Sequence, residues 1–418
     1  MAVRAVDELT NEVLGYDPLE PGQAADPYPR YGELRARAPV SETMAGFRFI
    51  ARHADASTAL RDASTFSSAL GMRIHGQRLD DEDQAINEID APRHTKIRRL
   101  LISAFSPATV NAAEPSVVAL ARQLVDALAP RGAVDLVEAF TVPLPITVIA
   151  TMLGIPPTDR DDFKRWSDDI MINGVYGRDG IKTLPEFHAY LDEQIESRRA
   201  ASTPSDDLVT KLVEAEVDGT RLTTREIRTQ VRFLVMAGNE TTTNLIGNTL
   251  YELLSRPGLW ARVGADRTLV PSAVEETLRY NAPVQFVPRT CTAPVEISGT
   301  AIEAEQRVLV GLGSANRDED VFDAAEEFSV DRGTDVPHLT FGLGPHFCIG
   351  AALARMEARV ALDALLDRLP DLALAPGFAY DKAPMMMVRG PQRLDVRFTP
   401  VPSHAGAAPP APEKDDPT

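Results

Sequence analysis

One stretch of ten residues sets the strongest constraint on what this chain can form. It reads Phe-Gly-Leu-Gly-Pro-His-Phe-Cys-Ile-Gly from Phe341 to Gly350, and an alanine-rich helical pattern follows directly. Glycines allow a backbone to approach a flat ligand closely, and a helix N-terminus favours the thiolate form of a nearby cysteine. The stretch therefore presents Cys348 as a candidate metal ligand, although a free cysteine is more often a small buried apolar residue.

Helical periodicity dominates the rest of the sequence. The segments with apolar residues three and four apart are 112–128, 157–171, 183–199, 224–255, 270–280 and 351–369. Short segments bounded by glycine or proline predict strands at 47–51, 295–297, 307–312 and 394–398. We therefore expect a mainly α-helical protein with small β-sheets. No linker divides the interior, which favours one large domain over residues 1–400.

Composition excludes several classes of function. The formal net charge of −18 argues against nucleic-acid binding, and no segment has the roughly 18 to 20 continuous apolar residues of a membrane anchor. Acidic residues near the start disfavour a signal peptide, so we expect a cytoplasmic protein. Two cysteines, Cys291 and Cys348, cannot build a disulfide framework. Proline and alanine are frequent in residues 401–418, which predicts a disordered tail without a catalytic role.

The longest helical pattern has an unusual centre, Met-Ala-Gly-Asn-Glu-Thr-Thr-Thr from Met236 to Thr243. Glycine costs about 1 kcal/mol relative to alanine inside a helix, and threonine hydroxyls compete with the backbone hydrogen bonds. We expect the helix to open locally here. The segment is either a polar patch satisfied by neighbouring helices or part of a functional site.

The pattern Phe-Gly-x-Gly-x-His-x-Cys-x-Gly resembles the haem-binding loop of the cytochrome P-450 monooxygenases, in particular the soluble, ferredoxin-dependent bacterial type. The resemblance implies the cytochrome P-450 fold, a single large helical domain that encloses a b-type haem. Cys348 would ligate the haem iron. Phe341, Gly342 and Gly350 would lie against the haem on the cysteine side, and Ala237 on the opposite side.

The centre of the long helix resembles the acid and alcohol pair of the same family, which would be Glu240 and Thr241. The threonine hydroxyl would hydrogen-bond dioxygen, and the carboxyl group would relay protons from solvent. Ala237 and Gly238 would leave room for the oxygen. Heterolytic O–O cleavage needs a thiolate ligand and two protons, so the two motifs describe opposite faces of one haem.

Glu276 and Arg279 lie three residues apart on one predicted helix face. Alone, such a pair is usually a surface ion pair of little energetic weight. In context it resembles the buried Glu-x-x-Arg element of the family, with Arg332 as its third, structural partner. Ser272 and Glu275 resemble a capping box at the start of this helix. Ala325 stands where the family often has proline, which implies a less rigid turn.

The segment from Asp90 to Arg98 places His94 and Arg98 on one helix face. Such a basic face is often only solvated, but here it resembles the family helix that binds a haem propionate. His346 and Arg289 match the other propionate contacts of the family. Paired hydrogen bonds from these groups would neutralise both propionates.

The resemblance implies that one atom of O2 enters a C–H bond while the other leaves as water. Two electrons would come from NAD(P)H through a separate ferredoxin and its reductase, because neither is fused to this chain. Arg93, Lys96 and Arg99 lie off the face that would bind the propionate. We expect them to form a docking patch for the ferredoxin.

The substrate pocket is predicted from the resemblance alone. By resemblance it includes the segments 68–88 and 168–184, and Met387. The individual residues expected to line it are Leu234, Val284, Phe286, Val287, Met385 and Met386, besides Ala237. These positions are largely apolar, and flexible methionines would make an adaptable wall. A terpenoid, a steroid, a macrolide and a fatty acyl compound fit about equally well.

Two other functions share part of this pattern. A peroxygenase that uses hydrogen peroxide would have the same cysteine loop, but such enzymes commonly lack the acid and alcohol pair. A haem sensor or carrier without enzymatic activity would need the cysteine loop alone. The pair Glu240 and Thr241 therefore favours a monooxygenase over both.

Overall fold

The computed structural model describes residues 16–17, 20–43, 46–71, 78–102, 105–159, 162–163, 165–166, 169, 184–217, 219–382 and 387–402. Its α-helices are α1 (Pro21–Ala25), α2 (Tyr28–Arg37), α3 (His53–Arg61), α4 (Arg93–Ile102), α5 (Pro107–Leu128), α6 (Pro143–Met152), α8 (Leu184–Ala200), α9 (Leu208–Glu214), α10 (Thr224–Leu254), α11 (Leu259–Ala265), α12 (Leu269–Tyr280), α13 (Leu312–Ala315) and α14 (Ala351–Arg368). Within the described ranges, no helix is long and apolar enough to cross a membrane.

Short helical turns and strands connect these helices. The turns are η1 (Asp81–Asp83), η2 (Ile86–Glu88), η4 (Ala129–Arg131), η5 (Val137–Thr141), η6 (Pro157–Asp159), η7 (Val330–Arg332) and η8 (Gly344–His346). The strands are β1 (Val40–Glu42), β2 (Arg48–Ile50), β3 (Phe66–Ser67), β4 (Ala133–Asp135), β5 (Glu216–Val217), β6 (Thr220–Arg221), β7 (Val287–Cys291), β8 (Val295–Ile297), β9 (Thr300–Ile302), β10 (Arg307–Val310), β11 (Ala373–Leu374) and β12 (Asp395–Arg397). The prediction of a mainly helical protein with small sheets is confirmed.

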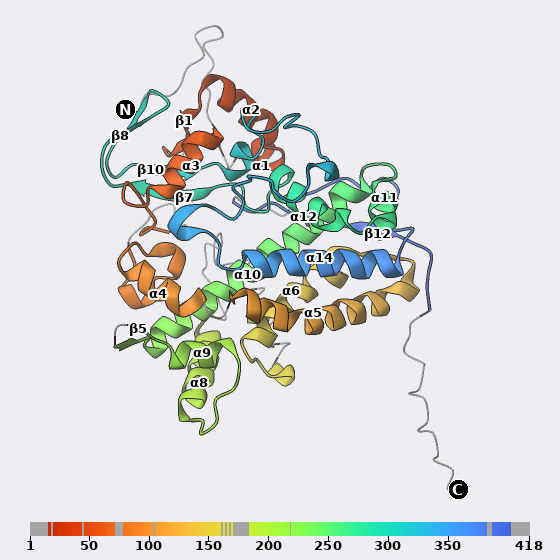
Figure 1. Cartoon of the computed structure of the whole chain (residues 1–418), viewed down its shortest axis with the longest axis horizontal. Coiled ribbons are helices and arrows are strands. Elements are labelled where there is room, and N and C mark those ends of the chain that lie inside the picture. Colours follow the sequence, from red (N-terminus) through yellow and green to blue (C-terminus); the bar gives the residue numbers. More distant parts are fainter. Residues whose placement is uncertain are drawn as a thin grey trace.

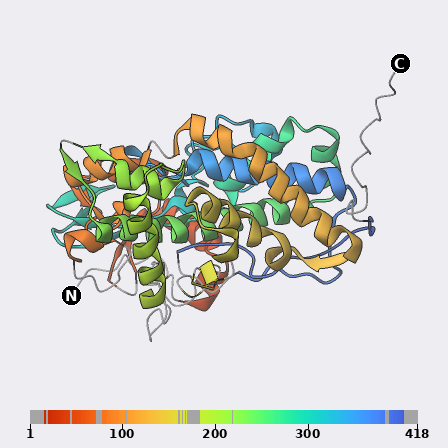
Figure 2. The same cartoon turned by 90° about the horizontal axis from the view of Figure 1, so that it is seen from below.

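Helix α10 is the central element of the fold. It crosses the molecule diagonally in Figure 1 and packs against α6, α8, α12 and α14. Its start is fixed by a capping box, in which Thr223 caps the first turn and the Glu226 side chain binds the Thr223 backbone. Helices α5 and α14 run beside each other in both views (Figures 1 and 2). Apolar residues of these helices form the largest core cluster.

A five-stranded sheet covers the other end of the molecule, with the strand order β1-β2-β10-β7-β3. Strands β10 and β2 are parallel, and the remaining neighbours are antiparallel. An aromatic cluster that includes Tyr16, Tyr31, Phe49 and Phe286 is buried against this sheet. Arg289 lies on β7 of this sheet. The sheet thus positions one residue of the site described below.

The predicted segments agree with the observed helices and strands to within a few residues, and the largest difference is at α5, which begins at Pro107 instead of residue 112. Seven of the fifteen residues of the predicted helix at 157–171 lie outside the described residues, and residues 157–159 form η6. One expectation is wrong: α10 is continuous through residues 236–243. The hydroxyl of Thr241 donates to the carbonyl oxygen of Ala237 and so adds a hydrogen bond along the helix instead of opening it.

Candidate functional site

Two glycines in the left-handed region shape the loop that precedes α14. Gly342 and Gly344 both have a φ of 71°, which strains residues that carry a Cβ atom. A Cβ atom on Gly344 would also lie 2.9 Å from the carbonyl oxygen of Leu60. The backbone N–H of Cys348 donates to the carbonyl oxygen of Phe341 at 2.8 Å. The loop therefore closes on itself and holds Cys348 just before α14 begins.

The side chain of Cys348 is exposed, yet protein surrounds it closely. Burial raises the pKa of its thiol, whereas the N–H groups of Gly350 and Ala351 and the charges of Arg98 and Arg355 act in the opposite direction. A sulfur atom that is both accessible and enclosed lines an interior recess. Within the described ranges, no group of three or more His, Cys, Asp or Glu residues could hold a metal ion. Cys348 thus fits a metal that brings its other ligands with it, as haem does.

Four side chains that can carry positive charge converge beside this loop. The rings of His94 on α4 and His346 in η8 have their centroids 4.1 Å apart. Arg98 follows one turn after His94, and Arg289 on β7 is 8% exposed. Among the described residues, Arg289 donates only to the carbonyl oxygen of its neighbour Pro288. The structure thus brings together all four residues that the sequence suggested, from three separate segments.

This set has positive charge but no carboxylate within ion-pair distance among the described residues. Burial, followed by the charges of His94, Arg289 and Arg98, lowers the pKa of His346 to about 3. Burial also lowers the pKa of Arg289 to about 10, and Nε2 of His94 is buried without a hydrogen-bond partner. Buried charges and donors without partners are costly. The set therefore fits an added anionic group, such as the propionates of haem.

The centre of α10 leaves open space on one side. A Cβ atom on Gly238 would meet nothing within 4 Å, and Ala237 is half-buried. The Oγ1 atom of Thr241 lies 2.5 Å from the carbonyl oxygen of Ala237. Burial raises the pKa of Glu240 from 4.5 to about 8, so its carboxyl group is protonated at neutral pH. This segment combines a small-residue surface with one hydroxyl group and one neutral acid.

The predicted Glu276, Arg279 and Arg332 triad is present, and its first two members are fully buried. Arg279 donates from Nε and Nη2 to the two carboxylate oxygens of Glu276 at 2.8 Å, and Nε of Arg332 donates to the same carboxylate at 3.1 Å. The backbone N–H of Ser329 adds a fourth hydrogen bond at 2.9 Å. Arg279 also donates to the carbonyl oxygen of Ala325. The interpretation as a surface ion pair is therefore wrong, and every charge here has its partner.

A second network near the cysteine loop was missed by the sequence argument. Ser272 and Glu275 form no capping box, because α12 begins at Leu269 and Ser272 donates to carbonyl oxygens of a distant segment. Glu275 instead accepts hydrogen bonds from Arg355 at 2.6 and 2.9 Å and lies 3.1 Å from His338. Burial alone would raise the pKa of Glu275, but these partners lower it to about 2. Arg355 lies about two helical turns after Cys348. This spacing is the one feature of the sequence that could have indicated its position near the cysteine loop.

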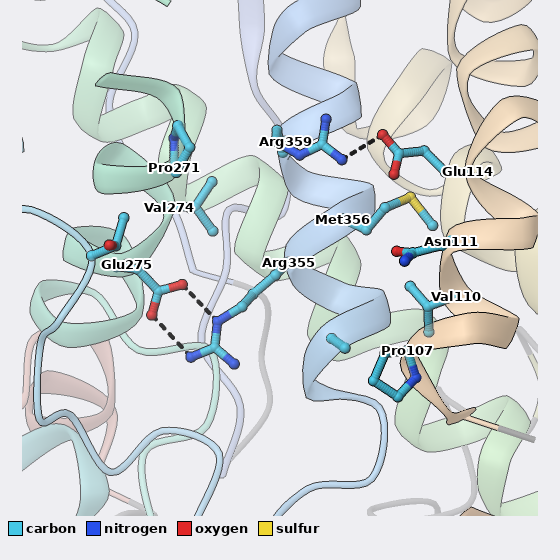
Figure 3. Close-up of a pocket in the computed structure, with 12 residues that line it drawn as sticks. Pro107, Val110, Asn111, Glu114, Pro271, Val274, Glu275, Arg355, Met356 and Arg359 are labelled. Carbon is cyan, nitrogen blue, oxygen red and sulfur yellow. Dashed lines mark hydrogen bonds and ion pairs between the residues drawn. The ribbon is translucent and has the colours of Figure 1, made fainter. Parts of the chain in front are cut away.

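A groove of about 520 Å³ lies between α5, α12 and α14. Figure 3 shows two ion pairs in it, Arg355 with Glu275 and Arg359 with Glu114. Met356 lies between the two arginines on α14. The groove borders the first turns of α14 and is separate from the predicted substrate pocket.

The predicted pocket residues have different environments. Val284 and Val287 are half-buried, whereas Leu234 belongs to the main core cluster. Phe286 is 1% exposed and lies within the aromatic cluster with Tyr16, which corrects its assignment to a pocket wall. Met385 and Met386 lie outside the described residues, as do residues 72–77 and most of 168–184.

The predicted docking patch is only partly supported. Arg93 forms an ion pair with Glu226 at the start of α10, at 3.0 Å, so it is engaged within the protein. Lys96 and Arg99 are exposed. Two large apolar residues are also exposed nearby: Ile102, at 48%, on the same helix and Phe347, at 40%, beside Cys348. Nη2 of Arg98 donates to the carbonyl oxygen of Phe347 at 2.7 Å and joins the two segments.

Comparisons with known proteins agree with this geometry. A family profile described as "Cytochrome P450" matches residues 161–370. The chain is 40% identical to "Cytochrome P450 monooxygenase PikC" of Streptomyces venezuelae, over 90% of this chain and 92% of that protein. It is 37% identical to "Steroid C26-monooxygenase" of Mycobacterium tuberculosis, over 89% of this chain and 94% of that protein.

The fold also matches solved structures. Cytochrome P450 CYP109Q5 from Chondromyces apiculatus superposes with a TM-score of 0.86 and 40% identity, over 92% of this chain and 98% of that one. The similarity thus includes both faces of the site, the cysteine loop and the centre of α10.

Proposed function

This chain belongs to the cytochrome P450 family, whose members bind haem b and act as monooxygenases, and we propose that it inserts one oxygen atom of O2 into a C–H bond of a bulky apolar small molecule. The observation that carries the proposal is the enclosed Cys348 thiol beside four donors that lack a carboxylate partner. Residues 1–400 would form one catalytic domain, which the packing of α10 against helices from both halves of the chain supports.

Cys348 would ligate the haem iron, and His94, Arg98, Arg289 and His346 would hold the propionates. Haem, when bound through a thiolate, supplies the activation of O2 and the chemistry of C–H oxidation. The protein contributes binding, orientation and proton delivery. The four donors suit this role because charge-assisted hydrogen bonds to carboxylates are about twice as strong as neutral ones.

Phe341, Gly342 and Gly350 would border the haem on the cysteine side, and Ala237 would border it on the side of α10. Small side chains at Ala237 and Gly238 keep that surface open for O2 and for the substrate. The closed triad of Glu276, Arg279 and Arg332 would act only as a structural support for the segment that leads to Cys348.

Glu240 and Thr241 would deliver protons. The reaction consumes two protons and two electrons for each O2, and it yields one hydroxylated product and one water. Glu240 carries a proton at neutral pH because burial raises its pKa to about 8, so it can donate that proton and regain one from solvent. Thr241 would present its hydroxyl group beside Ala237, whose carbonyl oxygen accepts a hydrogen bond from it.

Electrons would come from NAD(P)H through a separate ferredoxin and ferredoxin reductase. An acidic ferredoxin would dock on Lys96 and Arg99, with Ile102 and Phe347 as the apolar centre of the contact. Reversing both charges, Lys96→Glu with Arg99→Glu, should slow reduction by a surrogate ferredoxin and leave substrate binding unchanged. The control reverses the exposed Arg397 on β12, and β12 lies on the opposite side of the molecule from α4 in Figure 1. Equal reduction rates in all three proteins would remove this docking site.

The substrate wall would include Val284, Val287, Leu234, Met385 and Met386. A relative named for a steroid reaction supports a bulky apolar substrate. Terpenoids, macrolides and fatty acyl compounds fit the same apolar wall.

The test of the proposal is turnover with a surrogate ferredoxin system under isotopically labelled O2. A monooxygenase places one labelled atom in the product and needs the electron donor. A peroxygenase would instead take its oxygen from added hydrogen peroxide, and a sensor or carrier would form no product. Either of these two results would contradict the proposal.

A further inference from the structure

Three arginines follow one another along the N-terminal half of α10, at positions 225, 228 and 232. Arg225 pairs with Asp83 of η1 at 2.5 Å, and Arg228 pairs with Asp192 of α8 at 2.5 Å. Arg232 differs from both, because no carboxylate among the described residues lies within ion-pair distance of it. Arg232 is half-buried and is thus the one cation of this row without an ion-pair partner among the described residues.

The surroundings of Arg232 make this lack of a partner costly. Burial lowers the pKa of Arg232, and the carboxylates of Glu88 and Asp83 oppose that shift only from a distance. Its Nη1 atom lies 3.4 Å from Nε2 of His188 on α8. Burial and the charges of Arg232 and Arg228 lower the pKa of His188 to about 4, so His188 is neutral. Arg232 thus has one neutral neighbour, and a buried charge normally requires more than that.

The position of Arg232 relates it to the proposed reaction site. Positions 232, 236 and 240 are four residues apart, so Arg232, Met236 and Glu240 lie along one side of α10. Two helical turns, about 12 Å, separate Arg232 from Glu240. Helix α8 packs across this half of α10 (Figure 1). A molecule that lies along this side of the helix would meet a cation at one end, the partly buried Met236 in the middle, and the acid and alcohol pair at the other.

We propose that Arg232, assisted by His188, binds a single carboxylate at one end of an elongated apolar substrate. This inference rests on the proposed monooxygenase function and adds the chemical class of its substrate. A guanidinium group matches one carboxylate through two parallel hydrogen bonds. A phosphate monoester, with about two charges, fits less well, because Asp192, Asp83 and Glu88 are close enough to influence His188 or Arg232. The substrate is thus an apolar acid whose chain extends from Arg232 along α10 towards the acid and alcohol pair.

The experiment titrates the ferric holoenzyme with straight-chain carboxylic acids and with the methyl esters, primary amines and alkyl phosphates of the same chain lengths. Binding is read from the spin-state change in the absorption spectrum. The acids should bind the unmodified enzyme at least about tenfold more tightly than the esters. Arg232→Gln should abolish this preference without changing ester binding, and Arg232→Lys should retain part of it.

Arg225→Gln is the matched control, because it removes a neighbouring arginine of the same row that already has its partner; it should leave the acid preference intact. Four results would overturn the inference: equal binding of acids and esters, no response to any acid, tighter binding of the phosphates, or equal weakening of acids and esters by Arg232→Gln. Binding to the ferric enzyme does not depend on oxygen insertion. Failure of this inference is therefore distinguishable from failure of the monooxygenase function, which is tested with labelled O2.

Discussion

Two groups of basic side chains in this protein differ in one respect. In the triad, Glu276 accepts hydrogen bonds from Arg279, Arg332 and the backbone of Ser329, so both arginines have a carboxylate partner within the fold. Beside the cysteine loop, His94, Arg98, Arg289 and His346 have no carboxylate within ion-pair distance among the described residues. Burial alone does not distinguish a structural arginine from a binding one. The presence or absence of the counter-charge does.

This difference assigns opposite consequences to similar substitutions. Removing Glu276 from the triad leaves the buried Arg279 without a counter-charge. Removing an arginine from the group beside the cysteine loop takes away a charge that the described residues do not neutralise. The first change should harm the fold, and the second should harm the binding of an added anion.

Glu276→Gln should have the largest effect. It leaves Arg279 buried without a counter-charge, which should lower the free energy of unfolding by roughly 3–5 kcal/mol. Urea denaturation of the purified protein measures this loss. Asp331→Asn is the matched control, because Asp331 lies beside Arg332 in η7 and its pair with Arg262 is exposed, so its loss should cost far less. Similar losses of unfolding free energy in the two variants would show that the buried triad stabilises the fold no more than an exposed ion pair does.

Arg289→Gln should act on haem and not on the fold. Losing one charge-assisted hydrogen bond should weaken haem retention by roughly tenfold to a hundredfold, measured as the rate and extent of haem transfer to an acceptor apoprotein. The apoprotein should be as stable as before, or more stable, in urea. Arg393→Gln, at an exposed pair with Asp395, should change neither property. A destabilised apoprotein with normal haem retention would reverse the assignment of Arg289.

Glu240 extends the comparison to a carboxyl group. Unlike Glu276, it has no arginine partner, and burial raises its pKa to about 8. The proton is held below this pH and lost above it. At pH 9 only about a tenth of the molecules retain it, so coupled product formation should fall by up to about tenfold between pH 7 and pH 9. Glu240→Gln should already be poorly coupled at pH 7 and show little further change. An unaltered pH profile in that variant would exclude the proton-delivery role.

Glu357 tests the comparison at a buried carboxyl group outside the proposed site. It is fully buried on α14, its Oε2 atom has no hydrogen-bond partner, and burial raises its pKa to about 8, although no function has been assigned to it. A raised carboxyl pKa stabilises the fold at low pH, and this contribution is lost as the pH rises through 8. Relative to Glu357→Gln, the unmodified protein should lose about 1 kcal/mol between pH 7 and pH 9. Parallel stability profiles would mean that the group is neutralised in another way.

Local patterns in the sequence predicted the fold class and the longest helices, and the family resemblance suggested the four residues that the structure brings together beside Cys348. The start of α10 could be predicted closely because it carries its own periodicity and capping box, and the cysteine loop because its glycines and Cys348 are contiguous. Contacts between distant segments could not be predicted. Ser272 and Glu275 have the spacing of a capping box, but stronger partners reach them from Val330, His338 and Arg355.

Other residues carried no local signal at all. Arg93 resembles a surface cation in the sequence, and only the packing of α4 near the start of α10 pairs it with Glu226. The resemblance assigned Phe286 to the pocket wall, but its ring packs onto Tyr16 in the aromatic cluster. Arg232 has no distinguishing feature in the sequence. That it lacks a counter-ion among the described residues depends on how α8 packs against α10.

The most direct test of the account is the absorption spectrum of the reduced carbon monoxide complex, recorded for the unmodified protein and for Cys348→Ser and Cys291→Ser. These are the only two cysteines in the chain, and Cys291 is buried in β7, where its thiol donates to the carbonyl oxygen of Ala293. The account predicts the thiolate-ligated band in the unmodified protein and in Cys291→Ser, and its loss in Cys348→Ser. A band that survives in Cys348→Ser, or that is missing from the unmodified protein with bound haem, would contradict the assignment of Cys348 as the ligand.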